Sequence, residues 1–81
     1  MKVIKGKIIG ILKSYGKIEE LDIKSGDIIL ACNVSNYQLK EVHIGNEVIV
    51  SIEDFPYIHE LGHKVYRTKG DININGTTYT V

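Results

Sequence analysis

Apolar and polar residues alternate along most of the chain in short stretches. Side chains of a β-strand point alternately to its two faces, so this pattern predicts strands that each bury one face. Between the stretches lie clusters of glycine, asparagine, aspartate and serine, which favour turns. The alternation predicts five short strands, over residues 3–12, 17–23, 28–32, 47–53 and 63–69.

The first of these stretches is the longest, and Gly6 and Gly10 interrupt it. An isolated glycine inside a strand marks a bulge or a sharp bend. A long first strand that bends at glycine can pair with different neighbours at its two ends. We therefore expect the strands to close into a small barrel.

Residues 33–45 lack the two-residue rhythm, and their apolar residues are spaced loosely enough for a loop with a short helix. Five short strands with one long helical connection between the third and the fourth are typical of the oligonucleotide-binding (OB) barrel. The predicted fold is therefore all-β, a five-stranded OB-type barrel with a short helical loop between strands three and four.

The C-terminal residues carry a separate signal. Asn75-Gly76, flanked by alternating residues, is the strongest short-range indication of a β-hairpin. We expect strands at 71–74 and 77–81 that dock on the barrel or on a partner. The predicted organisation is a barrel over residues 1–70 and a C-terminal hairpin extension over residues 71–81.

The composition agrees with a β-protein and limits its size. Ile and Val together number 21, whereas Leu and Ala number 6. β-Branched side chains are stiff in helices and pack well on a pleated sheet. A chain of 81 residues allows one small domain with a compact core.

The charges limit the possible partners. Ten Lys and Arg residues balance ten Asp and Glu residues, so the net charge is zero. No overall positive field attracts phosphates, and binding of a nucleic acid must depend on a local patch. Cys32 is the only cysteine, which we expect to be buried and reduced. Neither a signal peptide nor a membrane-spanning run is visible, and we expect a cytoplasmic protein without a membrane partner.

Residues 59–63, H-E-L-G-H, match the H-E-x-x-H pattern of zinc proteases. That pattern needs a helix, on which the two histidines share one face while the glutamate activates metal-bound water. Gly62 and Tyr66 disfavour a helix here, and a third protein ligand is hard to identify. We therefore expect no enzyme and no cofactor. A loop that binds metal through His59 and His63 remains as an alternative.

Several segments resemble a known family, bacterial translation initiation factor one. The letters G-N-E-V-I-V-S-I at 45–52, P-Y at 56–57 and G-H-K-V-Y-R at 62–67 resemble its segment G-D-x-V-x-V-E-L-x-P-Y-x-x-x-x-G-R-I-x-Y-R. Upstream, G-D-I-I-L-A-C at 26–32 is similar to its G-H-V-I-L-A-H strand, and G-K-I at 6–8 to its opening G-T-V.

This resemblance covers residues 6–69 and implies an OB barrel that binds RNA of the small ribosomal subunit. The family's loop between strands three and four is rich in Lys and Arg, whereas this chain has only Lys40 and His43 there. His63 replaces the family's Arg after the late glycine, and residues 71–81 have no counterpart.

A looser resemblance connects the chain with cold-shock domains. K-S-Y-G-K-I at 13–18 and D-I-I-L-A-C at 27–32 stand where that family has K-G-F-G-F-I and D-V-F-V-H-F. Only Tyr15 keeps an aromatic side chain of the base-stacking platform. Because stacking contributes roughly 1–3 kcal/mol per base, we expect single-strand binding of the cold-shock kind to be weak.

OB barrels bind RNA across strands two and three and the nearby loops, with cationic and aromatic side chains. On this basis ten residues are candidates for an RNA-binding surface: Lys13, Tyr15, Lys17, Lys40, His43, Tyr57, His63, Lys64, Tyr66 and Arg67. The simpler alternative is that the tyrosines pack the barrel mouth and the lysines only solvate a face. Glu19, Glu20 and Asp22 on strand two are expected to repel phosphate.

These patterns leave two possible functions. The first is a small RNA-binding protein that binds the small ribosomal subunit or single-stranded RNA. The alternative is an OB-like protein-interaction module without nucleic-acid binding, which uses residues 71–81 to extend the sheet of a protein partner.

Overall fold

Seven β-strands and their connecting loops make up the whole chain in the computed structural model, which describes residues 1–81. The strands are β1 (Lys2–Ser14), β2 (Lys17–Ser25), β3 (Ile28–Asn33), β4 (Glu47–Ile52), β5 (Tyr57–Ile58), β6 (Lys64–Ile74) and β7 (Thr77–Tyr79). The structure has no helix of the length and apolarity needed to cross a membrane.

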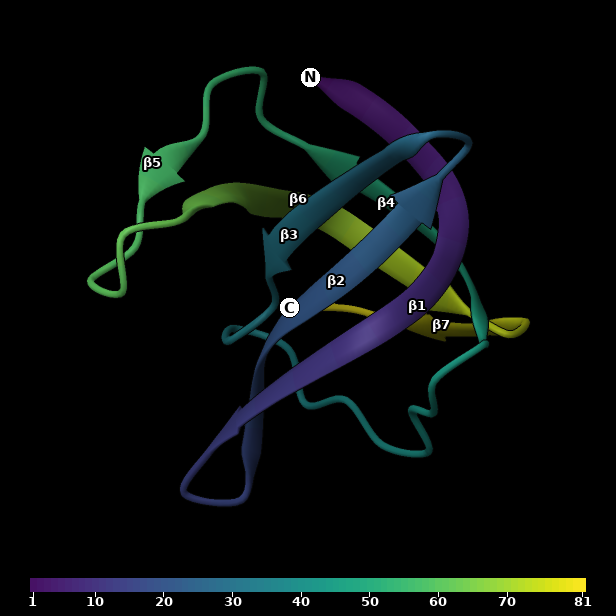
Figure 1. Cartoon of the computed structure of the whole chain (residues 1–81). Coiled ribbons are helices and arrows are strands. Elements are labelled where there is room, and N and C mark those ends of the chain that lie inside the picture. Colours follow the sequence, from purple (N-terminus) through teal and green to yellow (C-terminus); the bar gives the residue numbers. More distant parts are fainter.

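Five of the strands form a closed mixed barrel (Figure 1). Antiparallel pairs join β3 to β2, β2 to β1, β1 to β4 and β4 to β6. The barrel closes where β3 runs parallel to β6, with Cys32 opposite Tyr66 and Asn33 opposite Arg67. Strands β5 and β7 are additional and pair only with β6. The expected all-β barrel is thus confirmed, and its shape is consistent with an OB-like fold.

The long first strand bends and serves both sides of the barrel, as its glycines predict. Its first half pairs with β4 and its second half with β2, and Lys7 pairs with both. A register shift lies between Ile8 and Gly10. At Gly6 an added Cβ would lie 2.2 Å from the carbonyl oxygen of Lys24. Glycine therefore lets β1 approach β2 closely at the point where β1 changes partner, and Figure 1 shows the resulting curve.

The short helix expected between the third and fourth strands is absent, and residues 34–46 form an irregular loop. Its backbone groups bond to the barrel: the Val34 N–H donates to Glu19 O at 2.8 Å, and the Gly45 N–H to Ile8 O at 2.7 Å. Val34 and Tyr37 are buried, and the Tyr37 hydroxyl donates to the Gly70 carbonyl. The loosely spaced apolar residues of this segment therefore anchor a loop to the barrel and do not form one face of a helix.

The C-terminal hairpin is present, but its first strand continues β6. The expected separate strands 63–69 and 71–74 are one strand, which is irregular where β6 passes β4 between Lys69 and Asn73. Asn75 and Gly76 both have positive φ, 52° and 92°, as the tight turns of two-residue hairpins require. Because β6 also pairs with β4, the hairpin shares the barrel's sheet.

The core consists of twelve buried residues, nine of which are Ile or Val, in agreement with the composition: Ile4, Ile8, Leu21, Ile23, Cys32, Val34, Tyr37, Val48, Val50, Ile52, Ile72 and Ile74. Every strand of the closed barrel contributes to this cluster. Ile72 and Ile74 show that residues after Gly70 help to fill the barrel interior.

We expect Ile72→Ala to lower the free energy of unfolding by about 2–5 kcal/mol, because Ile72 is fully buried and its truncation leaves a cavity. Ile49→Ala is the matched control, since Ile49 is 42% exposed and should lose less than about 1 kcal/mol. Equilibrium urea unfolding measures both values. Equal small losses would contradict the packing of the hairpin into the core.

We expect Gly6→Ala to lower the free energy of unfolding by about 1–3 kcal/mol, because the added methyl meets backbone atoms that cannot rotate away. Gly10→Ala is the control: its added Cβ would meet only side-chain atoms of Asp22, Oδ2 at 2.6 Å and Cβ at 3.1 Å, and rotation of the Asp22 carboxylate relieves the closer contact. The same unfolding measurement applies. Equal losses in the two variants would show that the close approach at Gly6 does not matter.

Candidate functional site

Residues 59–63, which spell the zinc-protease pattern, form the turn between β5 and β6. The His59 N–H donates to His63 O, and the Gly62 N–H donates to His59 O, both at 2.8 Å. Gly62 has φ of 89°, a conformation that glycine adopts without strain. The helix face on which a zinc protease places its two histidines therefore does not exist here. The turn instead brings the histidines side by side at the end of the β5–β6 hairpin.

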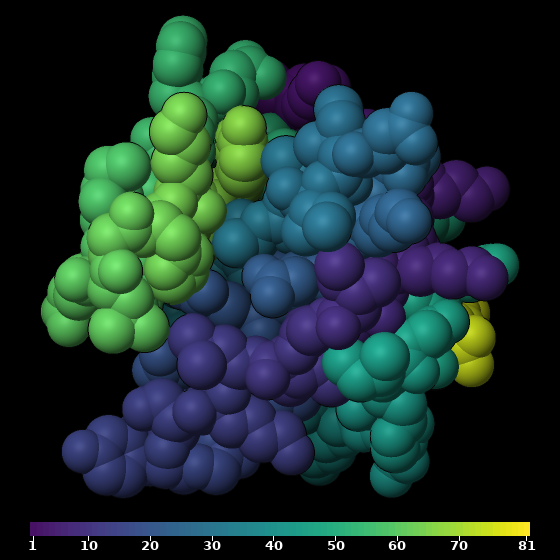
Figure 2. All heavy atoms as spheres, viewed as in Figure 1, coloured from purple at the N-terminus to yellow at the C-terminus, as the bar shows by residue number.

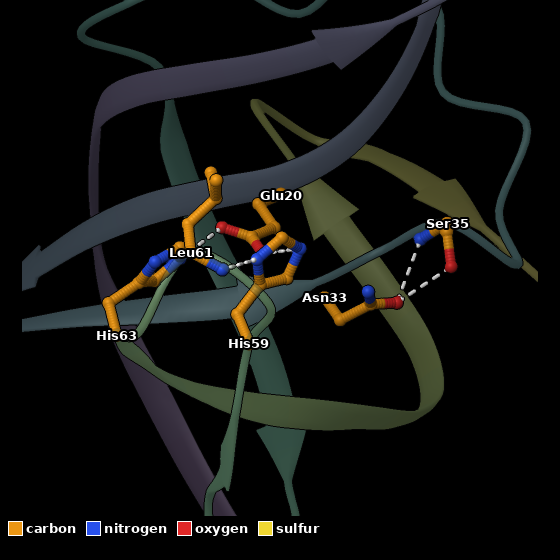
Figure 3. A network of polar contacts seen from close by, with 6 residues as sticks. All are labelled: Glu20, Asn33, Ser35, His59, Leu61 and His63. Carbon is orange, nitrogen blue, oxygen red and sulfur yellow. Dashed lines mark hydrogen bonds and ion pairs between the residues drawn. The ribbon is translucent and has the colours of Figure 1, made fainter.

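Both histidine side chains meet a glutamate from β2, as Figure 3 shows. His63 Nε2 lies 2.9 Å from Glu20 Oε2, and His59 Nε2 lies 3.4 Å from Glu20 Oε1. The two rings are stacked, with centroids 4.9 Å apart. Donor atoms of all three residues lie within 4.8 Å of one another. We call these three residues the Glu–His–His cluster.

The carboxylate of this cluster is buried, which makes its partners important. The Glu20 side chain is only 4% exposed, and its Oε1 atom accepts no hydrogen bond. A buried carboxylate is costly unless it is paired. The Leu61 N–H donates to His59 Nδ1 at 3.1 Å, so the proton of that neutral ring is on Nε2 and faces Glu20. The cluster can thus hold protons or a cation.

Sequence reasoning missed Glu20 as the third member of this cluster and placed it on a phosphate-repelling surface. A register shift between Leu12 and Lys13 of β1 leaves Glu19 without a partner and breaks the alternation of β2. Glu20 and Leu21 are consequently both buried. Figure 2 shows the green β5–β6 segment as a lobe against the body of the barrel. No local sequence signal reveals this contact, because it joins segments far apart in the chain.

Four of the ten predicted RNA-binding residues come together elsewhere. Lys13 near the end of β1 and Lys17 at the start of β2 line a hollow of about 540 Å³. Lys40 and His43 from the 34–46 loop line the same hollow. We call this hollow the basic groove. None of its three lysines forms an ion pair, and its only acid, Glu41, lies 3.8 Å from His43 Nε2.

Tyr15 is fully exposed at the tip of the β1–β2 turn, next to the basic groove. Its backbone has φ of 52°, and Gly16 follows with φ of 78°. Figure 2 shows this turn projecting from the body at the lower left. The aromatic ring is therefore accessible to a ligand.

Tyr57 and Arg67 form a second group, away from the basic groove. The Arg67 guanidinium carbon lies 4.9 Å from the centroid of the Tyr57 ring, the geometry of a cation–π contact. Both residues line a hollow of about 400 Å³ together with Lys69, whose Nζ pairs with Glu53 Oε1 at 3.1 Å. Arg67 itself forms no ion pair with a carboxylate.

The remaining predicted residues lie apart from these groups. His63 belongs to the Glu–His–His cluster, and exposed Lys64 pairs in register with Ile58 of β5. Tyr66 is half-buried against the core and lines a hollow beside Val3. The ten residues thus form two groups and three separate positions.

No protein-family model, curated protein or solved structure matches the chain.

Cys32 is the one thiol, and its surroundings make it unreactive. It is fully buried in the core, opposite Leu21 of β2. Burial, followed by the nearby carboxylates of Asp22 and Glu20, raises the pKa of the thiol from 9.0 to about 12. A nucleophilic cysteine needs a lowered pKa and solvent access, so Cys32 has a structural role as a small apolar residue.

We expect iodoacetamide to label Cys32 at pH 8 roughly 1,000-fold more slowly in the folded than in the urea-unfolded protein, because each pKa unit lowers the thiolate fraction tenfold. The thiol ionises above pH 9.0 in the unfolded chain but only near pH 12 in the folded protein. Its contribution to the free energy of unfolding is therefore complete below pH 9.0 and is lost as the pH rises to about 12. Cys32→Val, measured by urea unfolding, should lose less stability over this pH range, and the contribution of Tyr37, whose pKa burial also raises, should remain. Similar labelling rates in the two states would contradict the buried thiol.

Proposed function

We propose that this protein binds RNA without catalysing a reaction, with the basic groove as its phosphate-binding surface. The observation that carries this proposal is the set of three lysines, Lys13, Lys17 and Lys40, that face one hollow without any ion-pair partner. The chain as a whole is neutral, so such a local excess of positive charge is what attracts phosphate.

The size and the rim of the basic groove agree with a nucleotide ligand. Its volume of about 540 Å³ lies in the range typical of small-molecule sites. The exposed ring of Tyr15 offers a stacking surface, which contributes roughly 1–3 kcal/mol per base. Stacking with phosphate contacts is the usual way in which OB-type proteins bind single strands.

The pairing of charges removes one objection to an RNA-binding role. Glu20 on β2 is buried and is paired with His59 and His63, so its charge is not presented at the surface. Glu19 and Asp22 are half-buried. β2 therefore repels phosphate less strongly than it would if all three acidic side chains were fully exposed.

The choice of RNA rests on the resemblance of residues 6–69 to bacterial translation initiation factor one, together with a barrel consistent with an OB-like fold. We propose the small ribosomal subunit, in the cytoplasm, as the first partner to test. The Tyr57–Arg67 pair is a second place where a base can stack on an aromatic ring and a guanidinium plane.

One observation favours a second candidate function, protein binding through the C-terminal hairpin. Strand β7 pairs only with β6, so its outer edge is free. A free edge can accept a strand from a partner through backbone hydrogen bonds. The edge is only three residues long, Thr77–Tyr79, and we therefore rank this function second.

We expect the triple variant Lys13→Gln, Lys17→Gln and Lys40→Gln to bind a single-stranded oligoribonucleotide at least about tenfold more weakly than the wild type. Loss of three phosphate contacts should also reduce the slope of log affinity against log salt by about 2. Fluorescence anisotropy at several salt concentrations measures both quantities, and purified small ribosomal subunits serve as a second ligand.

The matched control is Lys2→Gln, Lys5→Gln and Lys24→Gln, which removes the same charge from exposed positions outside the basic groove. Its affinity for the oligoribonucleotide should stay within about threefold of the wild type, because it changes only the overall charge of the protein and removes no contact in the basic groove. Equal losses in the two triple variants would reject the basic groove as the binding surface. Absence of binding by the wild type would reject the RNA-binding function and favour the protein-binding hairpin.

A further inference from the structure

We infer that Glu20, His59 and His63 form a binding site for one divalent transition-metal ion, with Zn²⁺ as the ion that fits best. The site joins β2 to the turn between β5 and β6. It shares no residue with the basic groove, so it is independent of the proposed RNA-binding function.

The spacing of the donor atoms suits a tetrahedral ion. Zinc binds imidazole nitrogen and carboxylate oxygen at roughly 2.0–2.2 Å, which separates neighbouring ligand atoms by about 3.3 Å. The observed separations are 3.4 Å between His59 Nε2 and Glu20 Oε1, and 2.9 Å between His63 Nε2 and Glu20 Oε2. These two distances involve different oxygens of Glu20, and the donor atoms of the three residues all lie within 4.8 Å of one another. Side-chain rotations would bring the two imidazole nitrogens and one carboxylate oxygen around a single ion.

The unsatisfied oxygen of Glu20 is an independent sign of a missing ligand. Oε1 is buried and accepts no hydrogen bond, although it points toward His59 Nε2. The whole side chain is 96% buried, since its exposed fraction is 4%. Buried acceptors without a partner are rare in folded proteins, and a bound ion or water is one way in which they are satisfied. A cation between the carboxylate and the two rings would satisfy this oxygen.

The donor set selects the type of ion. Two imidazoles and one carboxylate suit Zn²⁺, whereas Mg²⁺ and Ca²⁺ prefer oxygen ligands alone. Three protein ligands leave a fourth position for water. The His63 side chain is 41% exposed, which gives an ion a route into the site from solvent.

Metal binding requires one change in the hydrogen bonds of the turn. His59 Nδ1 accepts the Leu61 N–H in the metal-free turn, so the ring proton is on Nε2. Coordination through Nε2 moves that proton to Nδ1, which can then no longer accept a hydrogen bond. The Leu61 amide is thus released when the ion binds, and it reports on coordination.

The ion would fix the hairpin that carries the Tyr57–Arg67 pair. Strand β5 pairs only with β6. The side-chain hydrogen bonds and ion pairs that join residues 57–63 to the barrel are those between the two histidines and Glu20. A metal cross-link to β2 would hold this hairpin in place. Glu60, which occupies the position of the catalytic base in the zinc-protease pattern, is exposed in the turn and is not one of the three donors. We assign the ion only this cross-linking role, because the exposed Glu60 is not held beside the donors.

The test is a titration of the chelator-treated, metal-free full chain with ZnCl₂, followed by NMR of the imidazole nitrogens and backbone amides. We expect one Zn²⁺ per chain, shifts of the Nε2 signals of His59 and His63, and a shift of the Leu61 amide. The His43 ring, which pairs with Glu41 at the surface, should not change. MgCl₂ should produce none of these shifts. Unchanged signals of His59 and His63 under ZnCl₂ would overturn the proposal.

Variants locate the site by affinity. Glu20→Gln and His63→Gln should each weaken Zn²⁺ binding at least about 100-fold in calorimetry, because each removes one of three ligands. His43→Gln is the control and should bind within about twofold of the wild type. A loss of binding in His43→Gln, or full binding in both cluster variants, would overturn the proposal. If a cluster variant does not fold, the ZnCl₂ titration of the wild type, followed through the imidazole signals of His59 and His63, tests the metal site instead.

Discussion

The barrel depends on one long strand whose two halves pair with different neighbours. β1 joins β4 through its first half and β2 through its second half, so it must curve sharply in between. Gly6 makes this possible, because any larger residue would collide with the Lys24 backbone. Without the curve, β2 and β3 could not swing round to meet β6, and the core of twelve residues would stay open.

Closure of the barrel also creates the Glu–His–His cluster. β3 and β6 meet through two residue pairs, and β6 leads directly from the turn that holds both histidines. A bulge between β1 and β2 turns Glu20 inward on the same side. The buried carboxylate and the histidine turn therefore stabilise one another, since each supplies charge or hydrogen-bonding capacity that the other lacks.

Folding distributes the charges of a neutral chain unevenly over the surface. Glu20 is paired with histidines in the interior, and Glu53 is paired with Lys69. The lysines of the basic groove have no such partners. A chain with no net charge can thus present a local positive surface, because the ends of β1 and β2 and the 34–46 loop bring lysines from distant segments together.

The sequence alone determined β1 to β4, the bend of β1 at its glycines and the Asn75-Gly76 hairpin turn, because alternation and turn residues act over a few neighbouring positions. It predicted neither β5 nor that β6 is one continuous strand. It did not predict the loop over residues 34–46, whose backbone bonds to distant strands instead of forming a helix. Only the tertiary structure decided that residues 59–63 form a turn and that Glu20 faces them. Glu20 and His63 are 43 positions apart, and their contact depends on a bulge and on barrel closure, neither of which any local pattern encodes.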